Sequence, residues 1–330
     1  MKVAVFSAKP YDREYLDAAN LADGHQLSYF DNPLDMGTVG LAAGHDAVCI
    51  FVNDTADASV LEALKRGGTN LIALRCTGFN NVDLKAAASL DMRVVRVVNY
   101  SPNAVAEHAV ALLLAVNRKI HRAYNRTRDF NFSLDGLMGF DFYGKTVAVV
   151  GTGKIGRVFA RIMLGFGCDV IGYDVVPSPE FEALGARYAR EAEIGAGADI
   201  ISLHCPLTPQ THHIINADML ARAKPGALLV NTSRGGLIDT EAAIGALKSR
   251  QLGGLALDVY EQEADLFFRD LSSTISTDDV LQRLVSFPNV IVTGHQAFFT
   301  REAITTICLT TLRSITEFAT GQALTNEIKM

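Results

Sequence analysis

A short apolar strand followed by three closely spaced glycines is the feature that most restricts how this chain can fold. Residues 146–150 are apolar and β-branched, and Gly151, Gly153 and Gly156 follow in the spacing G-x-G-x-x-G. Residues 157–166 then carry apolar side chains at helical spacing, so the segment predicts a strand, a tight turn and a helix. The first glycine permits the turn, the second lets the backbone approach a pyrophosphate, and the third lets the helix pack close to the strand. The segment therefore predicts a dinucleotide-binding site.

An acidic residue after the next predicted strand indicates which dinucleotide is bound. The strand ends at Asp174, about 20 residues beyond the glycines, where a carboxylate accepts hydrogen bonds from the adenosine ribose. No Arg occurs in residues 175–178, so nothing there favours a 2′-phosphate. A structural turn ending on a solvated Asp is the alternative, and the strand–turn–helix–strand context argues against it. We expect NAD, with its phosphates held at the helix N-terminus around Lys154 and Ile155.

Length and composition fit a globular chain of two domains. The 330 residues are too many for one typical domain, and a hydrophobic content of 49% allows a large core. With a net charge of −6 and no long basic block, we expect no nucleic-acid partner. No apolar run approaches a membrane span, so we expect no membrane association. The five cysteines lack a C-x-x-C pair, which is typical of reduced thiols in a cytoplasmic protein.

Two series of alternating strand and helix signals predict the two domains. Repeated strand–helix units imply a parallel sheet that is covered on both faces. The first series lacks a dinucleotide fingerprint and should hold something else; its strands are predicted at 2–7, 26–30, 47–51, 71–76 and 93–97 and its helices at 11–21, 58–66 and 82–90. The second has predicted strands at 146–150, 170–173, 199–204, 228–231, 254–259 and 290–293 and helices near 157–166, 217–223 and 240–250.

A long apolar helix is predicted between the two series. Ser101 can cap it and Pro102 is tolerated at its first position, so the helix should run from Asn103 to about Arg126. Residues 105–116 are apolar on nearly every face, which requires burial on all sides. Burial within one chain would satisfy this requirement. We favour a subunit interface, and hence a homodimer or homotetramer.

The last third of the chain holds two less regular features. Residues 263–287 contain no strong pattern and predict a long surface excursion. A final helix, from 301 to about 320, lies beyond the last predicted strand and could return to pack on the first domain. The first domain would then be discontinuous in sequence.

Polar side chains at the ends of the predicted strands are the candidates for chemistry. In doubly wound sheets, ligands bind beyond the carboxyl ends of the strands. Arg234, Glu261, Glu263 and His295 follow three strands of the second series, so they should converge near the nicotinamide end of a bound dinucleotide. Alone, such an Arg or His is more often a solvated or structural side chain. Their joint occurrence at one sheet edge favours a site, and the same rule places further residues beside the cofactor: Cys205, Pro206, Thr232 and Ser233.

These residue types fit hydride transfer to a 2-oxo acid. That reaction needs a proton donor for the carbonyl oxygen and a cation for the carboxylate. His295 suits proton transfer because its charge changes near neutral pH, and Arg234 can bind a carboxylate in fork geometry. Glu263 could accept the other ring N–H of His295 and favour the protonated ring, with Glu261 an equal rival.

Two other features are interpreted as structural. His212 and His213 are adjacent, and neighbouring residues point apart on a strand. No carboxylate or Cys in the sequence pattern completes a ligand set, so we expect no metal site. Cys205 should lie near the cofactor, but no base stands beside it in sequence, so we interpret its thiol as a packing group.

Together these pieces resemble the D-2-hydroxyacid dehydrogenase family over nearly the whole chain. Besides the glycine fingerprint, the resemblance rests on residues 75–83 (RCTGFNNVD), 101–107 (SPNAVAE), 231–235 (NTSRG), 258–261 (DVYE) and 294–297 (GHQA). Within the family, residues 265–268 (DLFF) and 294–298 (GHQAF) are most similar to fermentative D-lactate dehydrogenases. L-lactate and malate dehydrogenases carry the fingerprint near the N-terminus, so they match poorly.

The resemblance implies roles for particular residues. It makes Arg234 the substrate anchor, Glu263 the partner of the histidine and His295 the acid/base, which selects Glu263 over Glu261. It implies that backbone N–H groups around Thr77 and Gly78 hold the substrate carboxylate. It also implies that Tyr100 lines the substrate pocket and that Asp258 lies near the nicotinamide and the histidine.

The resemblance also implies an architecture and an activity. We expect an α/β fold of two doubly wound parallel sheets, with a flavodoxin-like substrate domain (1–100 and 299–330), a Rossmann-type NAD-binding domain (101–298) and a cleft between them that closes to exclude water. The expected reaction is reversible hydride transfer between NADH and pyruvate, giving D-lactate. One alternative is a reductase of glyoxylate, hydroxypyruvate or a larger 2-oxo acid. Another is an NADH-sensing, corepressor-like binding protein without activity.

Overall fold

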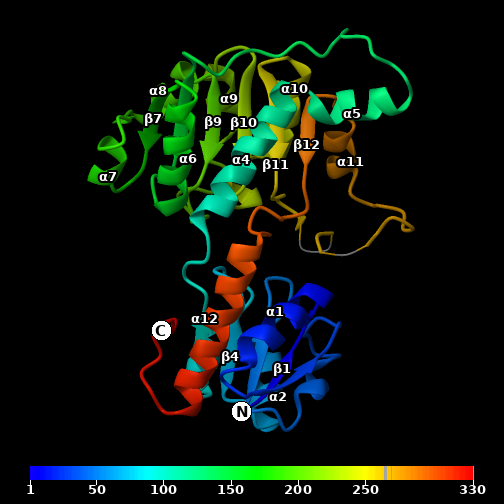
Figure 1. Ribbon diagram of the computed structural model, residues 1–330, viewed down its shortest axis with the longest axis vertical. Coiled ribbons are helices and arrows are strands. Elements are labelled where there is room, and N and C mark those ends of the chain that lie inside the picture. The colour runs from blue at the N-terminus through cyan, green and yellow to red at the C-terminus, as the bar shows by residue number, and fades with distance from the viewer. Residues whose placement is uncertain (264–265, 269, 330) are drawn as a thin grey trace. The chain divides into compact units, whose positions relative to one another are not determined.

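Two compact units make up the chain, and each contains one parallel sheet (Figure 1). The computed structural model describes residues 1–263, 266–268 and 270–329. One unit consists of Met1–Ser101 and the chain from Phe299 onward, and the other of Pro102–Phe298. The prediction of an α/β fold with two doubly wound parallel sheets is confirmed. Asp265, part of one family motif, lies outside the described residues.

The first unit has the strand order of a flavodoxin-like sheet. Its five strands lie in the order β2-β1-β3-β4-β5 and are all parallel. Every residue of the central strands β3 and β4 is buried, because helices cover both faces of the sheet. The elements are β1 (Lys2–Val5), α1 (Pro10–Asn20), β2 (Gln26–Tyr29), η1 (Val39–Ala42), β3 (Ala47–Ile50), α2 (Ala58–Arg66), β4 (Leu71–Leu74), α3 (Leu84–Ser89), β5 (Arg93–Arg96) and α12 (Arg301–Ala319).

The helix α12, last in the chain, belongs to the first unit. It packs on α1 and on the sheet at β4 and β5 (Figure 1). Its buried face includes Ile304, Cys308, Leu312 and Ile315, at the three- and four-residue spacing of one helix face. The helix begins after Thr300, whose hydroxyl accepts a hydrogen bond from the N–H of Ala303. The first unit is therefore built from both ends of the chain.

The second unit has a sheet of the Rossmann type with one further strand. Its strand order is β12-β11-β10-β9-β6-β7-β8, and the direction of winding reverses between β6 and β9. The elements are α4 (Pro102–Asn117), α5 (Ile120–Arg128), β6 (Thr146–Val150), α6 (Lys154–Gly165), β7 (Asp169–Tyr173), α7 (Pro179–Glu182), β8 (Arg187–Tyr188), α8 (Glu191–Gly197), β9 (Ile200–Leu203), α9 (Ala217–Arg222), β10 (Ala227–Asn231), η2 (Gly235–Leu237), α10 (Thr240–Lys248), β11 (Leu252–Leu257), α11 (Asp279–Val285) and β12 (Val290–Val292).

Both faces of this sheet carry a hydrophobic core. On one face α4 and α6 pack over strand residues such as Val149 and Val230 (Figure 1). On the other face α8, α9 and α10 pack over residues such as Ile201 and Leu229. The alternating side chains of one strand thus enter opposite cores, which explains why the strands are apolar throughout.

The long helix predicted between the two series is broken. α4 ends at Asn117, Lys119 has a φ of 52°, and α5 starts at Ile120. The side chain of Asn117 is turned inward, where it donates to the carbonyl of Phe140 and accepts from that residue's N–H. The prediction of one helix to Arg126 is therefore wrong, because a left-handed residue and a long-range polar contact interrupt the chain.

The burial that this apolar helix requires is supplied within its own chain, and the subunit interface expected on it stays a prediction. α4 contacts α6, β10 and β11 of its own unit, and Leu113 and Ala109 are fully buried within the single chain. Its exposed positions, such as Glu107 and Ala111, form a narrow strip. Because the helix packs on the sheet and beside α6, its own chain covers most of its apolar surface.

The segment predicted as a patternless excursion contains an ordered helix. Asp278 caps α11 by accepting a hydrogen bond from the N–H of Leu281, and Leu284 of this helix is fully buried. Asp278 also accepts from the hydroxyl of Tyr260, which fastens the helix to the end of β11. The sequence does not predict α11 because the helix is short and its apolar residues give only a weak periodic signal.

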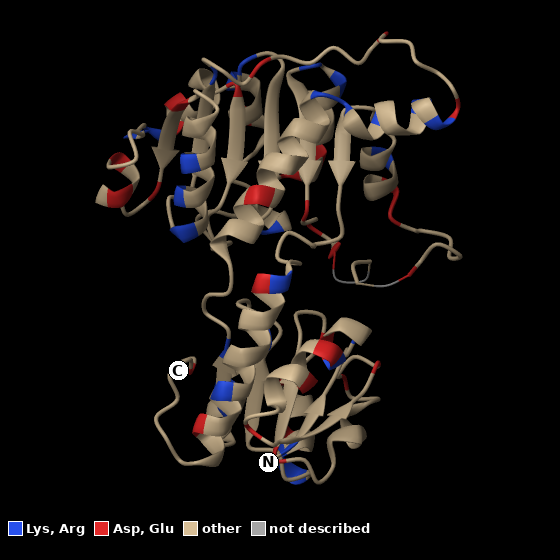
Figure 2. Cartoon of the chain, in the orientation of Figure 1, with Lys and Arg blue, Asp and Glu red and all other residues tan. Residues whose placement is uncertain are grey.

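Charge is spread over both units. Lys and Arg residues are interspersed with Asp and Glu in each of them (Figure 2). Among the described residues, no helix is long and apolar enough to span a bilayer.

Candidate active site

The glycine turn has the geometry that its spacing predicts. Gly151 has a φ of 93°, and a Cβ there would lie 2.4 Å from the backbone N of Cys205. A Cβ on Gly156 would lie 2.0 Å from the carbonyl oxygen of Gly151, so the turn and the helix can approach only without side chains. Gly153 is exposed and would place its Cβ in open space. The first and third glycines thus serve the packing of the chain, and the second leaves the backbone accessible to a ligand.

The helix α6 begins at Lys154, three residues earlier than expected, with Gly153 as its N-cap. Its first intrahelical hydrogen bond runs from the N–H of Arg157 to the carbonyl of Gly153. The preceding N–H groups, including those of Lys154 and Ile155, therefore have no partner within the helix, as at every helix start. Such N–H groups, next to an exposed glycine, suit the phosphates of a dinucleotide.

Asp174 stands beside this turn at the end of β7. Its carboxylate accepts hydrogen bonds from the backbone N–H of Thr152 at 2.7 Å and from the Thr152 hydroxyl at 3.1 Å. Its other oxygen accepts from the N–H of Val176 at 3.1 Å. The side chain is half-buried, so it is oriented by the chain while part of it stays accessible. This arrangement fits a carboxylate that binds ribose hydroxyls.

The residues after β9 and β10 line the same edge of the sheet. Ser233 donates from its hydroxyl to the carbonyl of Cys205 at 2.7 Å, which ties the two strand ends together. The hydroxyl of Thr232 is buried, and among the described residues no group hydrogen-bonds to it. A buried hydroxyl without a partner at this edge fits a ligand that supplies one. Pro206 is exposed next to them.

Cys205 is a buried packing residue, as interpreted from the sequence. Burial raises the pKa of its thiol to about 11, so the thiolate is scarce at neutral pH. The backbone N of Cys205 lies against Gly151, so any side chain at position 151 would clash with it. Its contact with a bound cofactor would therefore come through backbone and surface rather than through thiol chemistry.

Arg234 follows β10 and is half-buried at the start of the turn η2. The carbonyl of Arg234 accepts from the side-chain amide of Asn231 at 2.8 Å, and its guanidinium donates to the carbonyl of Ser233 at 2.7 Å. Among the described residues, no carboxylate forms an ion pair with it. The next residue, Gly235, would place a Cβ 2.1 Å from the backbone of Tyr260, so this turn packs directly on the end of β11. The guanidinium is thus held in place with hydrogen-bonding capacity left for an anion.

The structure separates the two glutamates that the residue pattern left equal. Glu263 accepts at 2.9 Å from Nδ1 of His295, while its other oxygen accepts from the backbone N–H of Tyr260, also at 2.9 Å. Glu261 instead lies 2.7 Å from Nε2 of His213. The side chains of His295 and Glu263 are 19% and 25% exposed, so the pair is partly shielded from water. Nδ1 of His295 thus faces a carboxylate, and Nε2 has no hydrogen-bond partner within the described part of the chain.

Asp258 holds the turn that carries the histidine. Its side chain is fully buried and accepts from the backbone N–H groups of Gln296 at 2.9 Å and Ala297 at 2.7 Å. Its carbonyl accepts from the N–H of His295, a residue with a φ of 53°. Since the carboxylate is enclosed by these donors, the geometry favours a positioning role over direct contact with a cofactor.

The residue pattern missed two partners of Asp258. His108, on α4, places its Nε2 3.4 Å from the Asp258 carboxylate and 3.2 Å from the hydroxyl of Thr293. Burial alone would raise the pKa of Asp258, but hydrogen bonds from His108, Thr293 and the backbone outweigh burial and lower it. The only sequence signal was a polar residue on an apolar helix, which does not say where it points.

Three predicted substrate residues lie in the first unit, after β4 and β5. The hydroxyl of Thr77 donates to the carbonyl of Val97 at 2.8 Å, and the carbonyl of Gly78 accepts from the thiol of Cys76 at 3.2 Å. Thr77, Gly78 and Tyr100 are all half-buried. These residues are therefore fixed at the carboxyl-terminal edge of the first sheet, which is where such sheets bind ligands.

The prediction that the side chains of His212 and His213 point apart is wrong. The two residues lie in a turn, not on a strand, and their rings stack with centroids 3.9 Å apart. Glu261, distant in sequence, supplies the carboxylate that the pattern lacked, and the ligand atoms of the three residues lie within 4.8 Å of one another. Tertiary folding brought them together.

Comparison with known proteins agrees with this geometry. Residues 110–297 match the family model of the D-isomer specific 2-hydroxyacid dehydrogenase, NAD binding domain. The chain is 51% identical to a D-lactate dehydrogenase of Escherichia coli over 328 residues, covering 99% of this chain and all of the relative.

Two solved structures show the same fold. The pyruvate reductase of Chlamydomonas reinhardtii superposes with a TM-score of 0.94 at 45% identity, covering 99% of this chain and 98% of that one. A D-lactate dehydrogenase with NAD⁺ from Lactobacillus jensenii gives a TM-score of 0.85 at 33% identity, with both chains covered in full. Because the matched domain is the family's NAD-binding domain, the cofactor is NAD. The chain belongs to the D-isomer specific 2-hydroxyacid dehydrogenases and is an NAD-dependent enzyme of that family.

Proposed function

We propose that this enzyme reduces pyruvate to D-lactate with NADH and catalyses the reverse reaction. The observation that carries the proposal is the Glu263–His295 pair at the edge of the sheet from which Arg234 also projects. The names of similar proteins support the choice of substrate, since one is a D-lactate dehydrogenase and another a pyruvate reductase. Bound NADH supplies the hydride that reduces the carbonyl carbon.

His295 is proposed to give the proton. Its Nδ1–H donates to Glu263, which leaves Nε2 to donate a proton to the carbonyl oxygen of the substrate as negative charge develops there. In lactate oxidation the same nitrogen takes the proton back. Glu263 fixes the orientation of the ring through its hydrogen bond to Nδ1.

Arg234 is proposed to anchor the substrate carboxylate. A guanidinium presents two parallel N–H donors to a carboxylate, and the backbone contacts of Arg234 hold this one in place. We propose that backbone groups of Thr77 and Gly78, with the side chain of Tyr100, also bind the substrate. In that assignment residues 1–100 and 299–330 serve as the substrate domain and residues 101–298 as the cofactor domain.

The cofactor is proposed to bind along the edge described above. The glycine turn and the start of α6 would hold its phosphates, and Asp174 its adenosine ribose. Thr232, with its buried hydroxyl, would contribute to the nicotinamide side. The remaining residues assigned to cofactor binding are Cys205, Pro206, Ser233 and Arg234, whereas Asp258 is proposed to position the turn that carries His295.

A panel of 2-oxo acids with NADH tests the proposed substrate. We expect the highest kcat/KM with pyruvate and a D-configured product, as measured by a stereospecific assay. A higher value for glyoxylate, hydroxypyruvate or a larger 2-oxo acid would assign the enzyme to that substrate instead. Cofactor binding without turnover of any acid would favour the sensor alternative.

We propose that the enzyme self-associates through residues 120–143. Within this stretch, seven large apolar or aromatic side chains are more than half exposed: Ile120, Tyr124, Phe130, Phe132, Leu134, Met138 and Tyr143. Arg and Asp residues occur there in equal number, so the same surface on a second copy would be complementary in charge. A second copy of this chain is therefore the proposed occupant, in a homodimer or a homotetramer.

A reducing compartment such as the cytoplasm is the proposed location. The five cysteines are free and buried. Burial raises the pKa of Cys49 and Cys168 to about 11 and that of Cys308 to about 12, which keeps these thiols protonated. Cell fractionation with an antibody against the chain would test the location.

A further inference from the structure

A cluster of potential metal ligands lies apart from the Glu263–His295 pair. Nε2 of His213 lies 2.7 Å from Oε1 of Glu261, and the ring of His212 stacks on that of His213 at an angle of 23°. One ligand atom from each residue lies within 4.8 Å of the others. The assigned chemistry uses none of these three side chains.

Backbone contacts fix the two histidines on one side of the chain. The N–H of His212 donates to the carbonyl of Thr208, and that of His213 donates to the carbonyl of Gly236. His213 has a φ of 51°, the left-handed conformation that turns the chain at this point. This turn, and not the alternation of a strand, brings the adjacent rings to the same side.

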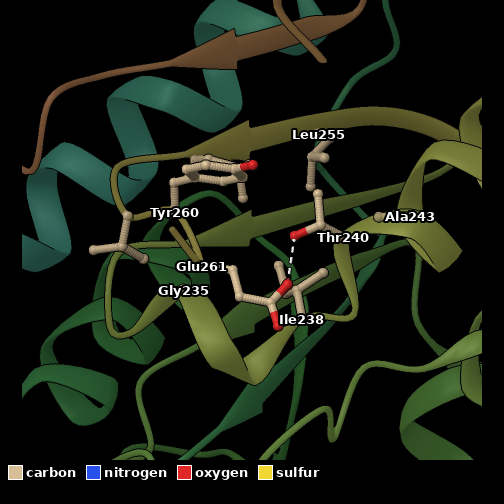
Figure 3. Close-up of a pocket in the computed structure, with 9 residues that line it drawn as sticks. Gly235, Ile238, Thr240, Ala243, Leu255, Tyr260 and Glu261 are labelled. Atoms are coloured by element: carbon tan, nitrogen blue, oxygen red, sulfur yellow. Dashed lines mark hydrogen bonds between the residues drawn. The ribbon is translucent and has the colours of Figure 1, made fainter. Parts of the chain in front are cut away.

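The carboxylate is held from a separate segment. Glu261 follows β11, and its Oε2 accepts from the hydroxyl of Thr240 at 3.0 Å (Figure 3). The two residues border a small pocket that Ile238, Leu255 and Tyr260 also line, with room for about one water molecule. The Thr240 hydroxyl thus orients the carboxylate from behind, as outer-shell groups do at metal sites.

We propose that His212, His213 and Glu261 form a binding site for a divalent transition-metal ion of the Zn²⁺ type. Two imidazoles and one carboxylate are a common ligand set for zinc, and they leave a fourth position for water. The same set also accepts Co²⁺, Ni²⁺ and Cu²⁺. Alkaline-earth ions, which prefer oxygen ligands, should bind much more weakly.

Binding requires a small rearrangement at His212. Ligand atoms placed 2.0–2.2 Å from a tetrahedral ion are roughly 3.4 Å apart. The ligand atoms of the three residues are now up to 4.8 Å from one another, so they must move closer together. Nearly parallel rings also do not aim their nitrogens at a common point. His212 is exposed, so its ring can leave the stack and turn toward the ion while His213 and Glu261 stay close to their present positions.

Titration with Zn²⁺ alone tests the site. The full-length protein is first treated with a chelator and then titrated in a calorimeter. We expect one ion per chain and a Kd at least about tenfold weaker in His212→Ala, since loss of an outer-shell partner alone typically costs about 10- to 100-fold. Thr240→Val should weaken binding by a smaller factor. His121→Ala removes a histidine elsewhere in the second unit and should leave the Kd unchanged.

Co²⁺ provides an independent readout. Tetrahedral coordination by nitrogen and oxygen should give visible absorption bands in the unmutated protein, and these bands should vanish in His212→Ala and in Glu261→Gln. Unchanged Zn²⁺ affinity in both variants, or equal weakening in His121→Ala, would overturn the proposal. His212 is exposed, so NADH turnover by His212→Ala verifies that the variant is folded.

Discussion

The proposed role of Arg234 as substrate anchor predicts how a Lys at this position changes the kinetics. Lys would keep the positive charge but lose the two-pronged geometry that binds a carboxylate. We expect Arg234→Lys to lower kcat/KM for pyruvate on the order of 10²-fold, as for loss of a charge-stabilising donor. Steady-state kinetics with pyruvate, together with NADH binding by fluorescence, measures both effects. The affinity for NADH should change little, and near-normal pyruvate kinetics would assign the anchor to another residue.

Glu263 and Glu261 form a matched pair for testing the acid/base assignment. Glu263 contacts the ring of His295, whereas Glu261 contacts His213. Glu263→Gln keeps a hydrogen-bonding group but removes the charge, so we expect kcat/KM to fall on the order of 10²-fold. Glu261→Gln, assayed with a chelator present, should retain activity within a few-fold. Equal losses in the two variants would contradict the assignment.

Asp174 tests cofactor choice at the scale of one carboxylate. Its negative charge repels a 2′-phosphate and accepts hydrogen bonds from ribose hydroxyls. We expect the enzyme to prefer NADH over NADPH. Asp174→Ala should weaken the binding of NADH and bring the kcat/KM values for the two cofactors closer together. The ratio of kcat/KM for the two cofactors measures the effect. An unmutated enzyme that uses both equally well would refute this role.

At the scale of elements, the turn between β12 and α12 depends on a single buried carboxylate. Asp258, at the end of β11, accepts hydrogen bonds from Gln296 and Ala297 in this turn, next to His295. An Asn at position 258 would point its amide N–H₂ group at the backbone N–H donors of this turn. We expect Asp258→Asn to destabilise the second unit by about 1–3 kcal/mol at pH 7, and to lower kcat by displacing the histidine. Urea unfolding measures the first effect and steady-state kinetics the second.

The same substitution has a pH dependence with a definite sign. The folded state lowers the pKa of Asp258, so its ionised form contributes stability above the unfolded value of about 3.9. That stability is lost as pH falls through the lower pKa of the folded state. The gap between the unmutated protein and Asp258→Asn should therefore shrink below about pH 4. Asp169→Asn, at an exposed position, should show no such convergence.

At the scale of the whole molecule, the exposed apolar residues of 120–143 predict self-association. Light scattering at micromolar concentration should give at least a dimer. Phe132→Ser should shift the protein toward monomer, because its ring is 69% exposed in the single chain and would lose contact area in the assembly. Leu21→Ser removes an even more exposed apolar side chain from the first unit and should leave the mass of the assembly unchanged. A monomeric unmutated protein would refute the proposal.

The sequence by itself determined the features that depend on neighbouring residues. The glycine spacing after residues 146–150 specified the strand–turn–helix unit, since the positive φ of Gly151 and the contact of Gly156 with Gly151 are local. Alternating strand and helix signals gave both parallel sheets, because each βα unit carries its own periodicity. Arg234 and His295 could also be identified as candidate site residues because each follows the end of a predicted strand.

Only the tertiary structure decided which distant side chains meet. Glu263 pairs with His295 and Glu261 with His213, although both glutamates follow the same strand. The apolar faces of α4 are covered by the sheet and α6 of its own chain, a contact that hydrophobicity alone cannot assign to one chain or two. The reason is physical: periodicity reports that a side chain must be buried or paired, while the identity of its partner depends on how separate elements pack in space.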